Sequence, residues 1–203
     1  MSKSTGVDFI LQQLGAASPK GYMAGMHIRF AGPLMQFQTY SQEWVDHYTE
    51  HGYTLRDPMI AWGLSKDGAW RWRDIDLPDP FNIFSQARDF GLTYGVVVGY
   101  GPLSSRSIVG CARDDREFND QEITEIASLV RTLHEATDPP ESLTDAQKQA
   151  LQLIADGHRH AAAAAKLGIS ESALKARLNS ARNRLLARTT AEAIQRAKDY
   201  RLL

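Results

Sequence analysis

Apolar and polar positions alternate with two different periods along the first two thirds of the chain, and this predicts a domain that mixes helices with strands. Apolar residues three or four apart, the spacing of an amphipathic helix, occur in residues 7–14, 41–51, 58–65, 82–90 and 117–134. Runs rich in β-branched and aromatic residues, typical of strands, occur in residues 26–30, 36–40, 70–72, 96–98 and 107–112. Gly32-Pro33 and Gly99–Pro102 lie between neighbouring runs and indicate hairpins. The fold class expected here is α+β, an α/β/α sandwich on a mainly antiparallel five-stranded sheet.

The last third of the chain reads as helices only. Two adjacent prolines, Pro139 and Pro140, exclude a helix and indicate a linker over 137–142, between a domain at 1–136 and a second at 143–203. The second domain has three helix-start signals: Thr144 with Gln147, Ser170, and Thr189 with Glu192. Together with an alanine-rich helix at 159–167, they predict an all-α four-helix domain. The short connection 168–171 between its second and third helices predicts a helix-turn-helix.

Charge is distributed unevenly along the 203 residues, whose formal net charge is −1. Residues 141–203 hold eleven Lys and Arg and six Asp and Glu, or 11 − 6 = +5, which leaves 12 − 18 = −6 for residues 1–140. A basic end on an acidic body favours a polyanionic partner such as DNA. Cys111, the single cysteine, excludes an internal disulfide framework and a cysteine-based zinc site. No secretory signal and no apolar run of membrane-spanning length is present, so we expect a cytoplasmic protein without a membrane partner.

The third helix of the second domain is the candidate DNA-reading element. Lys175 and Asn179 are four residues apart and share a face, and Arg177 and Arg182 add positive charge beside them. The alternative is that these are solvated charges on an ordinary helical bundle.

A second group of candidates lies in the first domain. Trp44 and Tyr48 are one helical turn apart, so the indole N–H and the phenol O–H can point into one space. Asp57 precedes Pro58, a combination that also starts helices. The alternative is that both aromatic residues belong to the core and that Asp57 is only a helix cap.

The segment from Leu143-Thr-Asp-Ala-Gln through Leu167-Gly-Ile-Ser170 to Arg184-Leu185 resembles the four-helix DNA-binding domain of LuxR-type transcription regulators. The resemblance implies base contacts by Lys175 and Asn179 and phosphate contacts by Arg177 and Arg182. This chain departs from the family where it has Ala146-Gln147, Gln149, Ala162 and Ala173-Leu174. The family usually has carboxylates at several of these positions, and they tie its helices together.

The first domain resembles the autoinducer-binding domain of the quorum-sensing branch of that family. The hallmark positions that match, in order, are Tyr40, Trp44, Tyr48, Asp57, Pro58, Trp72 and Gly95. The ligand implied is an N-acyl homoserine lactone, with no cofactor and no metal. Asp57 accepts its amide N–H, Trp44 donates to the lactone carbonyl and Tyr40 donates to the acyl carbonyl.

The same resemblance implies that Tyr48 lines the site and that Trp72 packs on the lactone ring. Cys111 falls where the family often has a small hydroxyl residue; alternatively, it is a small buried apolar residue.

These observations predict a quorum-sensing transcription regulator that binds a lactone and, as a homodimer, a near-palindromic stretch of double-stranded DNA. An alternative is an interaction protein of the same fold, an anti-activator or a ligand-independent regulator, which pairs with a related regulator as a heterodimer. An enzyme is not expected, and no catalytic residue is assigned. The sequence has no Gly-x-Ser-x-Gly elbow, no phosphate-binding glycine loop and no His-Glu-x-x-His.

Overall fold

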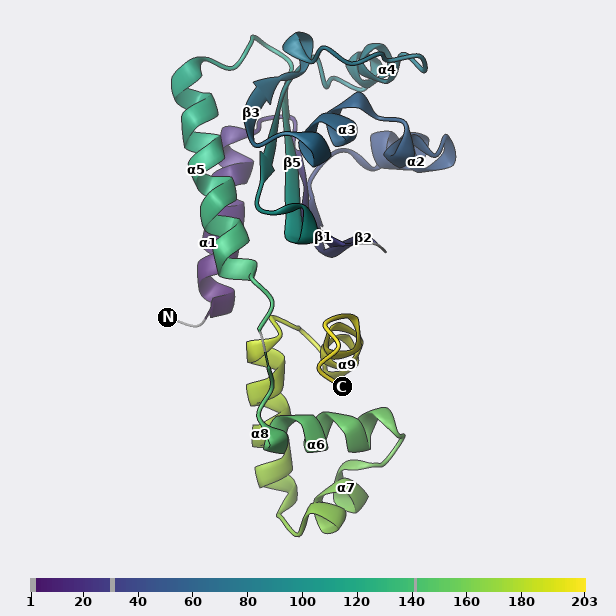
Figure 1. Cartoon of the computed structure of the whole chain (residues 1–203), viewed down its shortest axis with the longest axis vertical. Coiled ribbons are helices and arrows are strands. Elements are labelled where there is room, and N and C mark those ends of the chain that lie inside the picture. Colours follow the sequence, from purple (N-terminus) through teal and green to yellow (C-terminus); the bar gives the residue numbers. More distant parts are fainter. Residues whose placement is uncertain (1–2, 30–31, 141) are drawn as a thin grey trace. The chain divides into compact units, whose positions relative to one another are not determined.

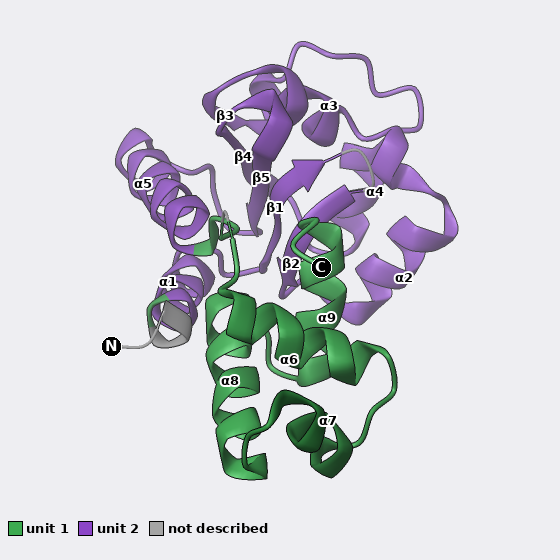
Figure 2. Cartoon of the chain, turned by 60° about the horizontal axis from the view of Figure 1, so that its bottom comes forward, with its two compact units in different colours: residues 1–6, 137–203 green, residues 7–136 purple. Residues whose placement is uncertain are grey.

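The computed structural model of the chain describes residues 3–29, 32–140 and 142–203. It divides into two compact units, residues 7–136 and residues 137–203 with 1–6 (Figure 2). We call them the sandwich unit and the four-helix unit. The helix α5 runs to Thr137, the first residue of the expected linker, and Glu141 of that linker lies outside the described residues. Within the described ranges, no helix combines the length and the apolar character needed to cross a bilayer.

The sandwich unit is built on one antiparallel sheet with the strand order β2-β1-β5-β4-β3 (Figure 1). Its strands are β1 (Tyr22–Arg29), β2 (Gly32–Gln38), β3 (Gly68–Arg71), β4 (Tyr94–Tyr100) and β5 (Arg106–Arg113). Every residue of the central strand β5 is buried, because helices cover both faces of the sheet there. The expected five-stranded, mainly antiparallel sheet is confirmed.

Helices form a layer on each side of this sheet (Figures 1 and 2). On one side lie α1 (Lys3–Ala17) and α5 (Asp120–Thr137), and on the other lie α2 (Gln42–Glu50), α3 (Pro58–Ser65) and α4 (Ile83–Asp89). Short 3₁₀ turns lie in three of the connections: η1 (Tyr53–Leu55) between α2 and α3, η2 (Trp72–Asp74) between β3 and α4, and η3 (Leu103–Ser105) between β4 and β5. The helices on the second side are short and begin at local caps: Ser41 accepts a hydrogen bond at the start of α2 and Asp57 at the start of α3.

The first hairpin differs from the expected one. β1 begins at Tyr22, four residues before the expected start, and β2 ends at Gln38, so Tyr40 lies outside the strand. The reason is that β1 lies between β2 and β5 and is buried on both faces, which removes the polar alternation from its first residues. Pro33 belongs to β2 rather than to the turn, which an edge strand tolerates. Phe30, expected in the first strand, lies outside the described residues.

The third expected strand is shifted along the sequence. β3 begins at Gly68, two residues before the expected start, and ends at Arg71, and Trp72 opens the 3₁₀ turn η2. The indole of Trp72 lies on the backbone of Gly95 in β4, where a Cβ atom would come within 2.1 Å of the ring. The glycine at position 95 therefore lets Trp72 pack flat on the sheet.

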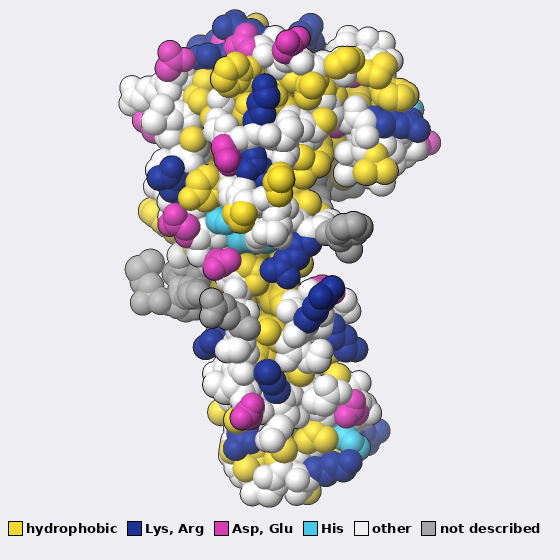
Figure 3. Space-filling model, viewed as in Figure 1, with side chains coloured by type: hydrophobic (Ala, Val, Ile, Leu, Met, Phe, Trp, Pro, Cys, Tyr) yellow, Lys and Arg dark blue, Asp and Glu magenta, His cyan; other side chains and the backbone are white. Residues whose placement is uncertain are grey.

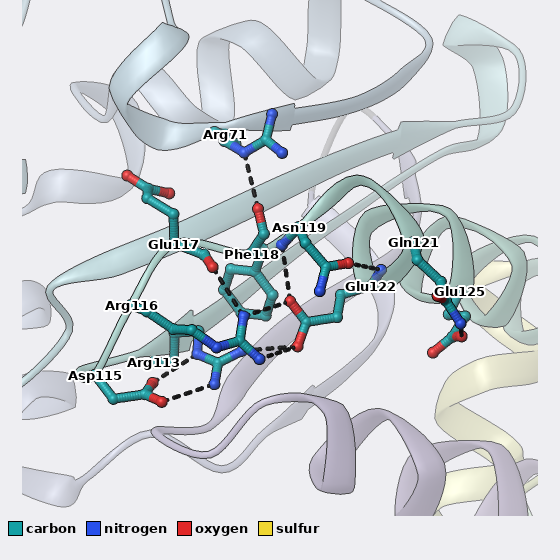
Figure 4. Close-up of polar contacts among 10 residues, drawn as sticks. All are labelled: Arg71, Arg113, Asp115, Arg116, Glu117, Phe118, Asn119, Gln121, Glu122 and Glu125. Atoms are coloured by element: carbon teal, nitrogen blue, oxygen red, sulfur yellow. Dashed lines mark hydrogen bonds and ion pairs between the residues drawn. The ribbon is translucent and has the colours of Figure 1, made fainter.

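A group of charged side chains attaches the start of α5 to the ends of β3 and β5 (Figure 4). Asn119 and Glu122 exchange backbone-to-side-chain hydrogen bonds of 2.8 and 2.9 Å, which is a capping box. Glu122 also accepts hydrogen bonds from Arg113 and Arg116. Arg71, directly before Trp72, donates to the carbonyl oxygen of Phe118 at 2.9 Å.

The four-helix unit contains α6 (Asp145–Ala155), α7 (His160–Leu167), α8 (Glu171–Arg184) and α9 (Thr190–Asp199). The predicted capping box of Thr144 and Gln147 is confirmed, as are the caps at Ser170 and Thr189. Gly168 ends α7 with a φ of 64°. Gln147 donates to Ser180 of α8 at 2.9 Å and so joins two helices.

Candidate functional site

A cavity of about 710 Å³ lies in the sandwich unit between the sheet and the layer of α2, α3 and α4. This is within the usual size of a small-molecule site. Its floor is one face of β1, β2 and β5, and its walls come from α2, α3 and α4, from η1 and η2, and from Tyr40 in the loop after β2. Five of the six residues that the sequence assigned to a ligand line it: Tyr40, Trp44, Tyr48, Asp57 and Trp72.

Asp57 is the central polar group of the cavity wall. Its Oδ1 accepts a hydrogen bond from the backbone N–H of Met59 at 2.7 Å, and its Oδ2 accepts one from the Tyr48 hydroxyl at 2.8 Å. The side chain is buried, and among the described residues no cation pairs with it. Burial raises the pKa of Asp57 to about 6, although the hydrogen bonds from Tyr48 and Met59 lower it. The carboxylate can therefore accept a further hydrogen bond, and an added donor would favour its ionised form.

The helix-cap interpretation of Asp57 is confirmed, and so is the core position of Trp44. Asp57 caps α3 while it lines the cavity. Trp44 is only 5% exposed and packs with Tyr48, their ring centroids 5.5 Å apart, but its indole N–H has no hydrogen-bond acceptor among the described residues. Structural and cavity-lining positions thus coincide in these side chains.

The two other aromatic residues of the site differ in their partners. The Tyr40 hydroxyl donates to the carbonyl oxygen of Gly110 at 2.8 Å, and burial raises its pKa well above the ordinary value. Trp72 has a buried indole N–H without a partner in the described part of the chain. A buried donor of this kind is costly unless something accepts from it.

Cys111 does not belong to this cavity. Side chains on a strand alternate between the two faces, and the neighbouring Gly110 faces Met59 and Tyr40 on the cavity side. Cys111 therefore faces α1, is fully buried beside its strand partner Tyr22, and has a pKa raised by burial to about 12. The structure supports the alternative, a small buried residue, and corrects its assignment to the ligand.

The residues missed by sequence reasoning are mainly apolar and line the rest of the cavity. They include Met23, Gly25, Ile28, Pro33, Ile60, Leu64, Ile83, Phe84 and Ile108, together with the polar Arg29, Gln36, Gln38, Thr49 and Thr54. Strand pairing brings those on the sheet together: Met23 pairs with Gly110 and Gln38, and Gly25 pairs with Ile108 and Gln36. In the sequence, the one signal for this was the two-residue spacing of Met23 and Gly25, which places both on the same face of a strand.

The candidate DNA-reading residues lie on α8 of the four-helix unit. Lys175 and Asn179 are exposed, Arg177 and Arg182 are half-buried, and Leu174 and Leu178 between them are buried. Arg182 donates to the Asn179 side chain at 3.2 Å. Lys and Arg side chains are spread over the face of this unit seen in Figure 3. In the described parts of both units, no three His, Cys, Asp or Glu side chains form a group able to hold a metal ion.

Comparison with known proteins agrees with this geometry. Residues 29–137, more than half of the chain, match the family described as autoinducer binding domain. The chain belongs to this family. Its homologues are quorum-sensing regulators of the LuxR type and not enzymes.

Two relatives and one solved structure show the extent of the likeness. The quorum-sensing regulator RhlR of Pseudomonas aeruginosa is 29% identical over 148 residues, 66% of this chain and 61% of RhlR. The chain thus spans about six tenths of RhlR. The transcriptional activator RaiR of Rhizobium etli is 28% identical over 183 residues, 80% of this chain and 74% of RaiR. The crystal structure of Escherichia coli SdiA has the same fold, with a TM-score of 0.56 and 20% identity over 100% of this chain and 92% of SdiA.

Proposed function

We propose that this member of the autoinducer-binding family is a transcription regulator that binds an N-acyl homoserine lactone in the sandwich-unit cavity. The observation that carries the proposal is Asp57, a buried carboxylate without a cationic partner among the described residues, in the wall of a cavity that is otherwise mainly apolar. A lactone offers one amide N–H, two carbonyl groups and an apolar tail, which matches such a wall.

Each polar group of the ligand has a candidate partner. The amide N–H donates to Asp57, because a charge-assisted hydrogen bond is the strongest that the wall offers. Trp44 donates its indole N–H to the lactone carbonyl, and Trp72 packs on the lactone ring. Tyr40 donates to the acyl carbonyl, for which its hydroxyl leaves Gly110. Tyr48 holds the Asp57 carboxylate in place through its 2.8 Å hydrogen bond.

The output proposed for the four-helix unit is binding of double-stranded DNA. The helices α7 and α8 are joined by only three residues, 168–170, as in a helix-turn-helix. In this proposal Lys175 and Asn179 contact base edges and Arg177 and Arg182 contact phosphates. A homodimer would place two α8 helices on a near-palindromic site.

Thermal unfolding with a panel of lactones of different acyl length tests the ligand. A ligand at one hundred times its Kd adds about 2.7 kcal/mol to the stability of the folded state, so a rise of several degrees in Tm is expected. The rise should be lost in Asp57→Ala and kept in Asp46→Ala. Asp46 is the control because it is an exposed carboxylate of α2 that accepts a hydrogen bond from Gln42 at 2.7 Å and does not line the cavity. An unchanged Tm with every lactone would contradict the proposal.

A further inference from the structure

The cavity floor contains a glycine, Gly25, at a position where neither the backbone conformation nor close packing requires glycine. A Cβ atom there would lie 3.5 Å from Ile28 Cδ1, 3.6 Å from Pro33 Cβ and 3.8 Å from the Ile108 carbonyl oxygen, all ordinary contacts. Its backbone does not adopt the left-handed conformation. The space that a larger side chain would take is therefore cavity space.

Two other glycines of this region behave differently. A Cβ atom on Gly110 would lie 2.6 Å from Met59 Sδ, and one on Gly63 would lie 2.7 Å from Ile108 Cγ2. Both are required for close packing between the sheet and α3. Gly25 alone of these three keeps the cavity open without being required by its neighbours.

The strand register places Gly25 between the polar cluster and the hairpin end of the cavity. Met23 pairs with Gly110, whose carbonyl oxygen accepts from Tyr40, so this row borders the polar cluster. Gly25 and Ile108 form the next row on the same face. Ile28, with its partner Pro33 on β2, lies beyond them.

The length of this floor can be compared with an acyl chain. At about 3.3 Å per residue, the five steps from Met23 to Ile28 cover roughly 16 Å, and somewhat less because of the bulge between Gly25 and Ile28. With carbon–carbon bonds of about 1.5 Å, an extended hydrocarbon advances about 1.3 Å per carbon. A tail of about ten to twelve carbons matches the floor.

We propose that Gly25 determines the acyl-chain length that the cavity accepts, and that the ligand is a lactone with a long tail of about ten to twelve carbons. The tail passes over Gly25 and ends beside Ile28 and Pro33. The inference rests on the proposed function, since it takes the polar cluster as the place of the lactone and amide.

The test is calorimetric titration of the full chain and of Gly25→Ala and Gly25→Leu with N-butanoyl, N-octanoyl and N-dodecanoyl homoserine lactone. The wild type should bind the dodecanoyl ligand at least about tenfold tighter than the butanoyl ligand, because more apolar surface is buried. Gly25→Leu should lose at least about tenfold in affinity for the dodecanoyl ligand and keep its butanoyl affinity, with Gly25→Ala in between. Gly15→Ala is the control for Gly25→Ala, because Gly15 lies on α1 and does not line the cavity, and a Cβ atom there has room, 3.8 Å from Tyr22 Cε1.

Tm values of the unliganded variants establish that each is folded. If Gly25→Leu does not fold, the wild-type panel and Gly25→Ala decide the question. A wild type that binds the butanoyl ligand tightest, or a folded Gly25 variant with unchanged dodecanoyl affinity, would overturn the inference and leave the proposed function standing. Binding of no lactone by the wild type would overturn both.

Discussion

At the scale of single residues, Asp57 shows how far the sequence could lead. The Asp-Pro pair predicted the start of α3, because a helix cap is local chemistry. The burial of the carboxylate and its contact with Tyr48 depend on how α2 packs against α3, which no local pattern contains. The same limit explains why Cys111 was wrongly assigned to the ligand. It lies on the face of the sheet that points away from the cavity, and only the strand register determines this.

Asp57 also gives a prediction on stability. Its pKa is raised from 3.8 in the unfolded chain to about 6 in the folded protein, so the folded state binds the proton more tightly. Protonation of Asp57 therefore stabilises the folded state. This stabilisation is complete below pH 4 and is lost as the pH rises through 6. Asp57→Asn removes this loss and should make the unliganded protein more stable at pH 7 by about 1–3 kcal/mol, with a difference that shrinks towards pH 4. Urea unfolding at both pH values measures it. A variant less stable than the wild type at pH 7 would contradict the claim that the buried charge of Asp57 destabilises the folded state.

At the scale of elements, the ends of helices were predictable and the ends of strands were not. Thr144, Ser170 and Thr189 begin helices as expected, because each signal lies within four residues of the cap. β1 was placed four residues late because a strand covered on both faces loses its alternation. The network at the start of α5 joins side chains from three elements, so no local pattern beyond the Asn119–Glu122 capping box could indicate it (Figure 4).

This network predicts a pH-dependent contribution from Glu122. Hydrogen bonds from Arg116, together with those from Asn119 and Arg113, lower the pKa of Glu122 from 4.5 to about 2. The stabilisation is present above pH 4.5 and is lost as the pH falls through 2. Because the side chain is partly exposed, Glu122→Gln should cost only about 1–2 kcal/mol at pH 7.

Chemical denaturation at pH 7 and pH 2.5 measures this loss. Glu125→Gln is the matched control, since Glu125 is an exposed carboxylate of the same helix that contacts only Gln121 in the network drawn in Figure 4. Equal effects of the two substitutions at pH 7 would contradict a specific role for Glu122.

At the scale of the whole molecule, the sequence indicated the kind of site but not its extent. The aromatic residues and Asp57 were found from their spacing and from family resemblance, whereas the apolar floor arises from pairing between β1, β2 and β5. The charge contrast between the two parts of the chain, by comparison, was simple arithmetic and needed no structure.

That contrast predicts how DNA binding should depend on salt. Arg177→Ala should weaken binding to random-sequence DNA and reduce the slope of log K against log salt by about one, because one proposed phosphate contact is lost. Lys198→Ala, an exposed lysine on α9, is the control and should leave the slope unchanged. Fluorescence anisotropy titrations at salt concentrations between about 50 and 200 mM measure the slopes of both variants. Absence of salt-dependent binding with and without lactone would favour the alternative, a protein that acts on other regulators.

The most direct test of the account is calorimetric titration of the tightest-binding lactone into the wild type, Asp57→Asn and the exposed control Asp46→Asn at pH 7. The asparagine at position 57 keeps the size and the helix cap but removes the charge that accepts the ligand amide. A hydrogen bond to a charged group contributes about 1.5–3 kcal/mol, so Kd should rise by about 10- to 150-fold in Asp57→Asn and stay unchanged in Asp46→Asn. Equal affinity of Asp57→Asn and the wild type would contradict the central claim that the buried Asp57 carboxylate holds the ligand.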